Sequence, residues 1–167
     1  MMISKLKSLF SKDDKELIYA PIPGDVIPVT KVSDPTFGQE LVGKGVAIIP
    51  REGKVYAPVN GNVSTIFPTL HAIAMVSENG AEILMHIGLE TVKLKGEFFT
   101  AHVESGADVK KGDLLLEFDV EAIKNAGYDI VSPVVVCNVD NYAVIDSKVD
   151  QNAGNKDVII ALTKNAQ

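Results

Sequence analysis

Two of the three histidines in this 167-residue chain lie in one short apolar segment, at a spacing that could support chemistry. The segment is T-L-H-A-I-A-M-V-S-E-N-G-A-E-I-L-M-H-I-G-L-E-T-V, residues 69–92, with His71 and His86 near its two ends. Two apolar runs flank Asn79-Gly80, and Asn-Gly between such runs is typical of a β-hairpin because both residues tolerate a positive φ. The pattern predicts a hairpin with one histidine on each arm.

The turn length decides whether the two histidines meet. A two-residue turn at Asn79 and Gly80 pairs Ile73 with His86. His71 and His86 then share a face as diagonal neighbours, with backbones roughly 7–8 Å apart. Both imidazoles could contact one phosphate-sized group, although a one-residue change in the loop would place them on opposite faces. The alternative interpretation is two ordinary half-buried histidines.

A facing histidine pair suits phosphoryl transfer through a phosphohistidine. A neutral imidazole nitrogen is a nucleophile near pH 7, provided that a hydrogen bond orients the other ring nitrogen. The second imidazole can donate to the phosphoryl oxygens as charge develops. The Thr69 hydroxyl could orient His71 in this way, and the Gly88 carbonyl could orient His86.

Motifs for other chemistries are absent from the sequence. It has no G-x-S-x-G elbow, no G-x-x-x-x-G-K-[ST] phosphate loop, and no H-x-H or H-E-x-x-H zinc motif. His71 and His86 could still hold zinc where a partner's carboxylate completes the site, because two ligands alone do not make a zinc centre. V-K-K-G-D at residues 109–113 suggests a lipoyl- or biotinyl-like carrier, but no M-K turn motif accompanies it. We expect no cofactor to be required.

Composition predicts one globular domain, with 46% apolar and 23% charged residues. The net charge of −6 argues against nucleic-acid binding and favours a basic protein partner or solubility. The single cysteine, Cys137, excludes a disulfide framework and is expected to be a small buried hydrophobe. Because no signal peptide or bilayer-spanning run is found, we expect a cytoplasmic protein, with a monomer as the default.

Short apolar segments broken by Pro and Gly predict an all-β antiparallel sandwich or barrel over residues 17–167. Y-A-P-I-P-G-D-V at residues 19–26 is echoed by Y-A-P-V-N-G-N-V at residues 56–63, which predicts a duplicated β structure. Residues 106–119 predict a second hairpin with Gly112-Asp113 in its turn, and only residues 120–126 look helical. The other predicted strands are 17–20, 25–29, 45–49, 54–57, 61–67, 134–139, 142–145 and 157–163.

Two further segments carry apolar residues outside this strand pattern. Residues 1–16 space apolar residues at helical intervals with lysines between them, which is typical of an amphipathic helix on a membrane surface. The alternative is a flexible tail that orders only on contact. The loop at residues 34–45 presents Phe37 and Leu41, which are either anchors folded onto the core or parts of a docking patch.

The hairpin segment resembles the glucose-type (type-1) enzyme IIA of the bacterial phosphoenolpyruvate:sugar phosphotransferase system (PTS). Supporting matches are V-G-x-G-x-A-I-x-P at residues 42–50, A-P-V-x-G at 57–61 and V-K-x-G-D at 109–113, and the resemblance extends over residues 18–162. It implies a β-sandwich or barrel fold and a phosphocarrier function in sugar uptake. It also implies that the phosphorylation state could serve a regulatory role.

The resemblance also implies residue roles. His86 matches the histidine that accepts a phosphoryl group on Nε2 from the carrier HPr and passes it to a cysteine of a IIB domain. His71 matches a second histidine that contacts the group without carrying it, and Thr69 matches the threonine that orients this second ring. The implied docking face consists of Phe37, Leu41, Phe67, Ile87 and Val92, with Asp34 and Glu90 at its rim.

Overall fold

The computed structural model describes residues 14–166, which fold mainly into short antiparallel strands. The strands are β1 (Lys15–Tyr19), β2 (Gly24–Pro28), β3 (Lys44–Pro50), β4 (Lys54–Tyr56), β5 (Gly61–Ile66), β6 (Ala72–Ser77), β7 (Glu82–His86), β8 (Phe99–Ala101), β9 (Asp108–Val109), β10 (Leu114–Phe118), β11 (Ser132–Val136), β12 (Tyr142–Ser147), β13 (Gln151–Ala153) and β14 (Val158–Lys164). The helical segments are η2 (Val29–Lys31), α2 (Pro35–Gly38), η3 (Thr91–Leu94), α3 (Val120–Asn125) and η4 (Val139–Asn141). The all-β prediction and the short helix near residue 120 are confirmed, but the expectation that no other segment is helical is wrong, because α2, η2, η3 and η4 also form.

The predicted amphipathic segment lies outside the described residues, except for its last three positions. β1 begins at Lys15, so the folded part starts before the predicted boundary at residue 17. Glu16 belongs to this strand, and its carboxylate accepts a hydrogen bond from the Ser77 hydroxyl at 3.0 Å. This hydrogen bond therefore links β1 to the turn end of the histidine hairpin.

The strand order shows an internal two-fold repeat. The eight-stranded sheet has the order β13-β2-β3-β11-β7-β6-β5-β9, and the smaller sheets are β1-β14-β12 and β4-β10-β8. Outward from the central pair β11 and β7, the flanking strands are β3 and β6, then β2 and β5, then β13 and β9. The two Y-A-P corners bond reciprocally: Tyr19 N donates to Pro58 O, and Tyr56 N donates to Pro21 O. The predicted duplication is confirmed.

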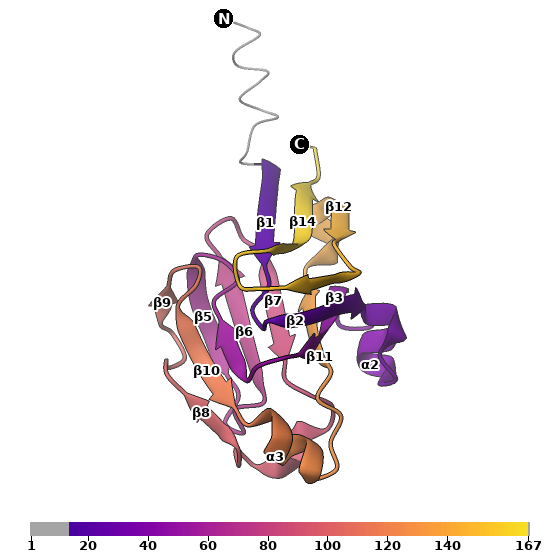
Figure 1. Ribbon diagram of the computed structural model, residues 1–167. Coiled ribbons are helices and arrows are strands. Elements are labelled where there is room, and N and C mark those ends of the chain that lie inside the picture. Colours follow the sequence, from indigo (N-terminus) through magenta and orange to yellow (C-terminus); the bar gives the residue numbers. More distant parts are fainter. Residues whose placement is uncertain (1–13, 167) are drawn as a thin grey trace, which may run out of the picture.

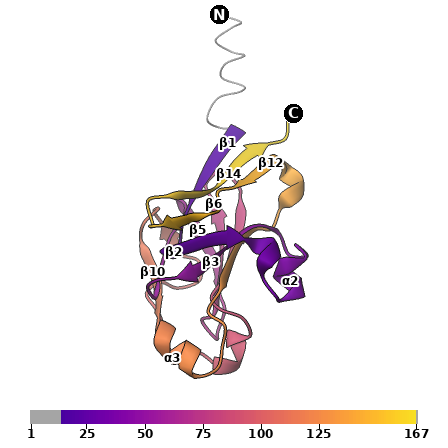
Figure 2. The same ribbon diagram turned by 45° about the vertical axis from the view of Figure 1, so that its right-hand side comes forward.

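A large apolar core lies among the sheets, and a second, smaller cluster lies beneath α2. The large core includes Ile18, Ile73, Met85 and Leu116, each at most 1% exposed. The smaller cluster consists of Val29, Val32, Phe37, Ala47, Leu89 and Val135. In Figures 1 and 2, α2 lies on one side of the molecule beside β3, whereas α3 lies at the end away from β1 and β14.

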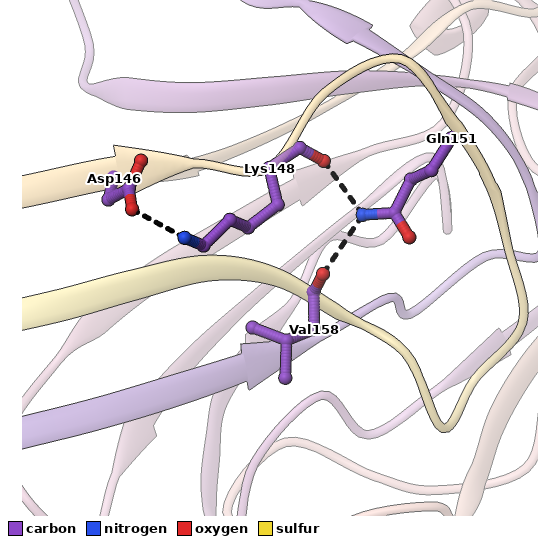
Figure 3. Close-up of polar contacts among 4 residues, drawn as sticks. All are labelled: Asp146, Lys148, Gln151 and Val158. Atoms are coloured by element: carbon purple, nitrogen blue, oxygen red, sulfur yellow. Dashed lines mark hydrogen bonds and ion pairs between the residues drawn. The ribbon is translucent and has the colours of Figure 1, made fainter.

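Local anchors close the loops between strands. Asp34 caps α2, because its side chain accepts a hydrogen bond from Thr36 N at 2.9 Å. At the start of β13, the Gln151 side-chain amide donates to the carbonyls of Lys148 and Val158 at 2.8 and 3.0 Å (Figure 3). These bonds tie β13 to the adjacent β14 and so fix one edge of the large sheet.

Two sequence expectations need correction here. The hairpin expected at residues 106–119 does not form, because β9 pairs with β5 while β10 pairs with β4 and β8. A turn is present there, with Gly112 at φ 94. Cys137 is exposed rather than buried, because it lies one residue beyond the end of β11. The short strands β8 and β13 carry too little periodicity to have been predicted.

Candidate active site

The hairpin that carries the two histidines has a three-residue loop instead of the expected two. Ser77 N donates to Ala81 O at 2.9 Å, and Gly80 N donates to Ser77 O at 2.9 Å, with Gly80 at φ 94. This is the pattern of a turn that ends in a left-handed glycine. The register therefore shifts by one residue, and Ala72 instead of Ile73 lies opposite His86.

The histidines nevertheless meet, with ring centroids 5.0 Å apart in an edge-to-face arrangement. Strict alternation in the observed register would point them to opposite faces. It does not apply to His71, because β6 begins only at Ala72 and the preceding Leu70 has a left-handed φ of 60°. The expected proximity is thus correct, but a bend before β6 produces it, not the predicted register.

A local hydrogen bond orients each imidazole through Nδ1. His86 Nδ1 lies 2.7 Å from the Gly88 carbonyl oxygen, which can only accept, so this nitrogen carries a proton. The neutral His86 ring therefore has its lone pair on Nε2. His71 Nδ1 lies 2.6 Å from Thr69 Oγ1, and a hydroxyl that donates here would leave Nε2–H of His71 as a hydrogen-bond donor. Both predicted contacts are present.

Burial keeps both rings neutral near pH 7. His71 is 5% exposed, and burial, with a smaller effect from neighbouring His86, lowers its pKa from 6.5 to about 4. Burial also lowers the pKa of His86, although the Gly88 carbonyl and the Asp34 carboxylate act in the opposite direction. An unprotonated His86 Nε2 is the form that a nucleophile requires.

Aromatic rings and an uneven apolar surface surround the pair. The Phe37 ring centroid lies 4.9 Å from that of His86, and the Phe67 centroid lies 5.5 Å from that of His71. Phe37 is 4% exposed and acts as an anchor in the cluster under α2, whereas Leu41 is 69% exposed. In the loop at residues 34–45, Phe37 is therefore an anchor on the core, whereas Leu41 is exposed and its docking role stays a prediction.

The remaining predicted docking residues differ in how far their side chains are exposed. Phe67 and Val92 are among the exposed large hydrophobic side chains. Ile87 is fully buried in the main core, so its side chain does not belong to an exposed face, and its expected docking role is corrected. Asp34 and Glu90 line a cleft of about 460 Å³ beside the site, together with Asp129.

The structure adds one polar residue that the hairpin sequence did not suggest. Ser132, at the start of β11, is fully buried, and its hydroxyl accepts a hydrogen bond from Gly88 N at 3.2 Å. It lies 44 residues from Gly88 in sequence. No local motif could have placed it here, because the contact depends on the pairing of β11 with β7.

Comparisons with known proteins identify the family of this chain. Residues 16–142 match the family described as "phosphoenolpyruvate-dependent sugar phosphotransferase system, EIIA 1". The chain is also 48% identical over 144 residues to the "PTS system glucose-specific EIIA component" of Halalkalibacterium halodurans, an alignment that covers 86% of this chain and 83% of that protein. This chain belongs to the EIIA 1 family. It is a PTS phosphocarrier in sugar uptake and a phosphotransferase component.

Two further similarities extend this assignment. The chain is 48% identical over 149 residues to the "PTS system beta-glucoside-specific EIIBCA component" of Bacillus subtilis, covering 89% of this chain and spanning only 24% of that longer protein. "Glucose permease IIA from Mycoplasma capricolum" has a solved structure that matches with a TM-score of 0.82 at 33% identity, covering 91% of this chain and 97% of that one. EIIA family membership implies HPr and IIB partners. Within residues 14–166, no helix has the length and hydropathy that a bilayer crossing requires.

Proposed function

We propose that Nε2 of His86 carries the phosphoryl group, which arrives from phospho-HPr and leaves to a cysteine of a IIB domain. In the first step the Nε2 lone pair attacks phosphorus while the bond from phosphorus to the donor breaks. In the second step the cysteine thiolate attacks phosphorus, the P–N bond breaks, and Nε2 regains its lone pair. The supporting observation is the bond from His86 Nδ1 to the Gly88 carbonyl, because it leaves Nε2 as the free nitrogen of a neutral ring.

We assign His71 to stabilise the phosphoryl oxygens without carrying the group. The ring lies 5.0 Å from His86 between centroids, close enough for its Nε2–H to reach an oxygen of a group bound to His86 Nε2. Thr69 serves this role by donating to Nδ1, which keeps the proton of His71 on Nε2. A donor already in place stabilises charge without reorganisation during the reaction.

The docking face that we propose for both partners surrounds the histidine pair. It consists of the exposed Leu41, Phe67 and Val92, with Phe37 behind His86 as its buried floor. Asp34 and Glu90 border the acidic cleft beside it, which suits a partner with basic side chains at its rim. A peripheral membrane contact through residues 1–16 remains a separate proposal, which liposome binding by the full chain and by a chain without that segment would test.

The sugar specificity, the cellular location and the oligomeric state of this protein are also proposals. Similar proteins are described as glucose-specific and β-glucoside-specific, so we propose a IIB domain of a glucose-type or related permease as the acceptor. We propose a cytoplasmic monomer that needs no cofactor. Zinc could bind at His71 and His86 only where a partner adds ligands, because no group of three or more potential ligands occurs within the described residues.

Phosphorylation of three proteins tests the residue roles. Wild type, His86→Gln and His71→Gln would be incubated with enzyme I, HPr and phosphoenolpyruvate, and the gain of one phosphate would be followed by intact mass. We expect an acid-labile, base-stable label on wild type and His71→Gln and no label on His86→Gln. We also expect His71→Gln to transfer its label to IIB poorly. Full labelling of His86→Gln would disprove the assignment of the acceptor.

A further inference from the structure

The carbonyl that orients His86 belongs to a peptide segment that side chains from elsewhere hold in place. Gly88 lies beyond the last residue of β7, so the hairpin ladder does not fix it. Its φ is 72°, a left-handed conformation that glycine adopts without steric cost. The same freedom would let this carbonyl rotate away from His86 Nδ1 unless the neighbouring peptide groups were anchored.

The peptide group before Gly88 has two side-chain anchors. Its N–H donates to Ser132 Oγ at 3.2 Å, and its carbonyl, that of Ile87, accepts from Thr91 Oγ1 at 2.5 Å. The peptide group after Gly88 has a backbone anchor, because Leu89 N donates to Asp129 O at 2.8 Å. The backbone angles of Gly88, and hence the direction of its carbonyl, are set between these two fixed planes.

The surroundings of Ser132 direct its hydroxyl toward the Gly88 peptide. Its side chain is fully buried, and its hydroxyl donates to Ile130 O at 2.8 Å, which leaves a lone pair directed at Gly88 N. A series of bonds therefore runs from the Ile130 carbonyl through Ser132 to the peptide of Gly88, whose carbonyl bonds His86. Such series strengthen each member, and a buried N–H left without its acceptor would seek another arrangement.

We propose that Ser132 is a positioning residue for phosphoryl transfer: its hydroxyl holds the Gly88 peptide so that His86 presents an unprotonated Nε2. The inference rests on the proposed role of His86 as phosphoryl acceptor. Ser132 lies on β11, which pairs with β7, so a residue of the neighbouring strand helps to set the tautomer of His86. In metal sites, groups that hydrogen-bond to a ligating imidazole fix its tautomer and orientation in the same way.

The test compares Ser132→Ala with Ser77→Ala. Ser77 is a matched control, because it is also a buried serine whose hydroxyl accepts a backbone N–H, from Ala81 at 2.9 Å, but at the turn end of the same hairpin. The readouts are the tautomer and pKa of His86 from nitrogen NMR and the rate of phosphorylation by phospho-HPr. His71, which Thr69 orients, provides an internal reference in every sample.

For Ser132→Ala we expect a mixture of His86 tautomers, a lower pKa of His86 because the Gly88 carbonyl raises it, and phosphorylation slower by about 10-fold. We expect Ser132→Thr, which keeps the hydroxyl, to restore the rate to within about twofold. Ser77→Ala should leave His86 unchanged. Folded Ser132→Ala with the wild-type tautomer and rate would overturn the proposal, as would the same loss in Ser77→Ala.

The proposal can still be tested if Ser132→Ala does not fold or if the wild type is not phosphorylated. If Ser132→Ala does not fold, Ser132→Cys, which offers a weak acceptor of similar shape, is compared with Ser132→Thr. Equal His86 tautomers in these two variants would then reject the proposal. If the wild type takes no phosphate on His86, the proposed function fails, while the NMR comparison still decides whether Ser132 sets the tautomer.

Discussion

The titration of His71 offers the sharpest test of the electrostatics at this site. Its pKa is lowered from 6.5 to about 4, chiefly by burial. In the unfolded chain the ring takes up a proton near pH 6.5. Between these values the unfolded state binds more protons than the folded state, so the free energy of unfolding must fall as the pH falls. Above pH 6.5 the contribution of neutral His71 is fully present.

The size of the effect follows from the two pKa values. Integrating the linkage from pH 7 to pH 5 gives a loss of about 2 kcal/mol from His71, and from pH 7 to pH 4 a loss of about 3 kcal/mol. Glu16 acts with the opposite sign, because burial raises its pKa and the folded state takes up its proton more readily. Glu16 is present in both wild type and a His71 variant, so its contribution cancels in their difference.

Urea unfolding at pH 7 and pH 5, for wild type and His71→Gln, measures this difference directly. We expect wild type to lose about 2 kcal/mol more than the variant over that interval. A nitrogen NMR titration of wild type should show His71 protonating well below pH 6.5. If both proteins lose the same free energy, or if His71 titrates near pH 6.5, the argument from burial is wrong.

Three further substitutions probe the backbone, the tautomer and the docking face. Gly88→Ala should destabilise the protein by about 2 kcal/mol or more, measured by urea unfolding, because a Cβ there would lie 2.7 Å from Thr91 Cγ2 and the φ of 72° is unfavourable for alanine. Thr69→Val should leave labelling by phospho-HPr intact but slow transfer to IIB by about 10-fold, because the proton of His71 is no longer held on Nε2. Leu41→Asp should raise KM for phospho-HPr with little change in stability, whereas Val144→Asp, which also changes an exposed apolar residue but on β12, should leave KM unchanged. Equal effects of the two would count against the docking face.

Features that depend on neighbouring residues were accessible from the sequence. The all-β class follows from the short apolar runs and their turn residues. Thr69 lies two positions from His71, and Gly88 lies two positions from His86, so both orienting contacts are local. The Asn79-Gly80 pair between two apolar runs likewise predicted the hairpin. In each case, the atoms that meet are separated by only a few bonds along the chain.

Tertiary structure decided what depends on packing between distant segments. A left-handed glycine at the end of the turn shifted the hairpin register by one residue, and only the bend at Leu70 returned His71 to His86. The fate of Phe37 and Leu41 depended on the small core beneath α2, which buries one and exposes the other. The sequence alone determined which groups could react. Their burial, their lowered pKa values and the Ser132 anchor required strands far apart in the chain to pack together, because desolvation and hydrogen-bond geometry arise only from that contact.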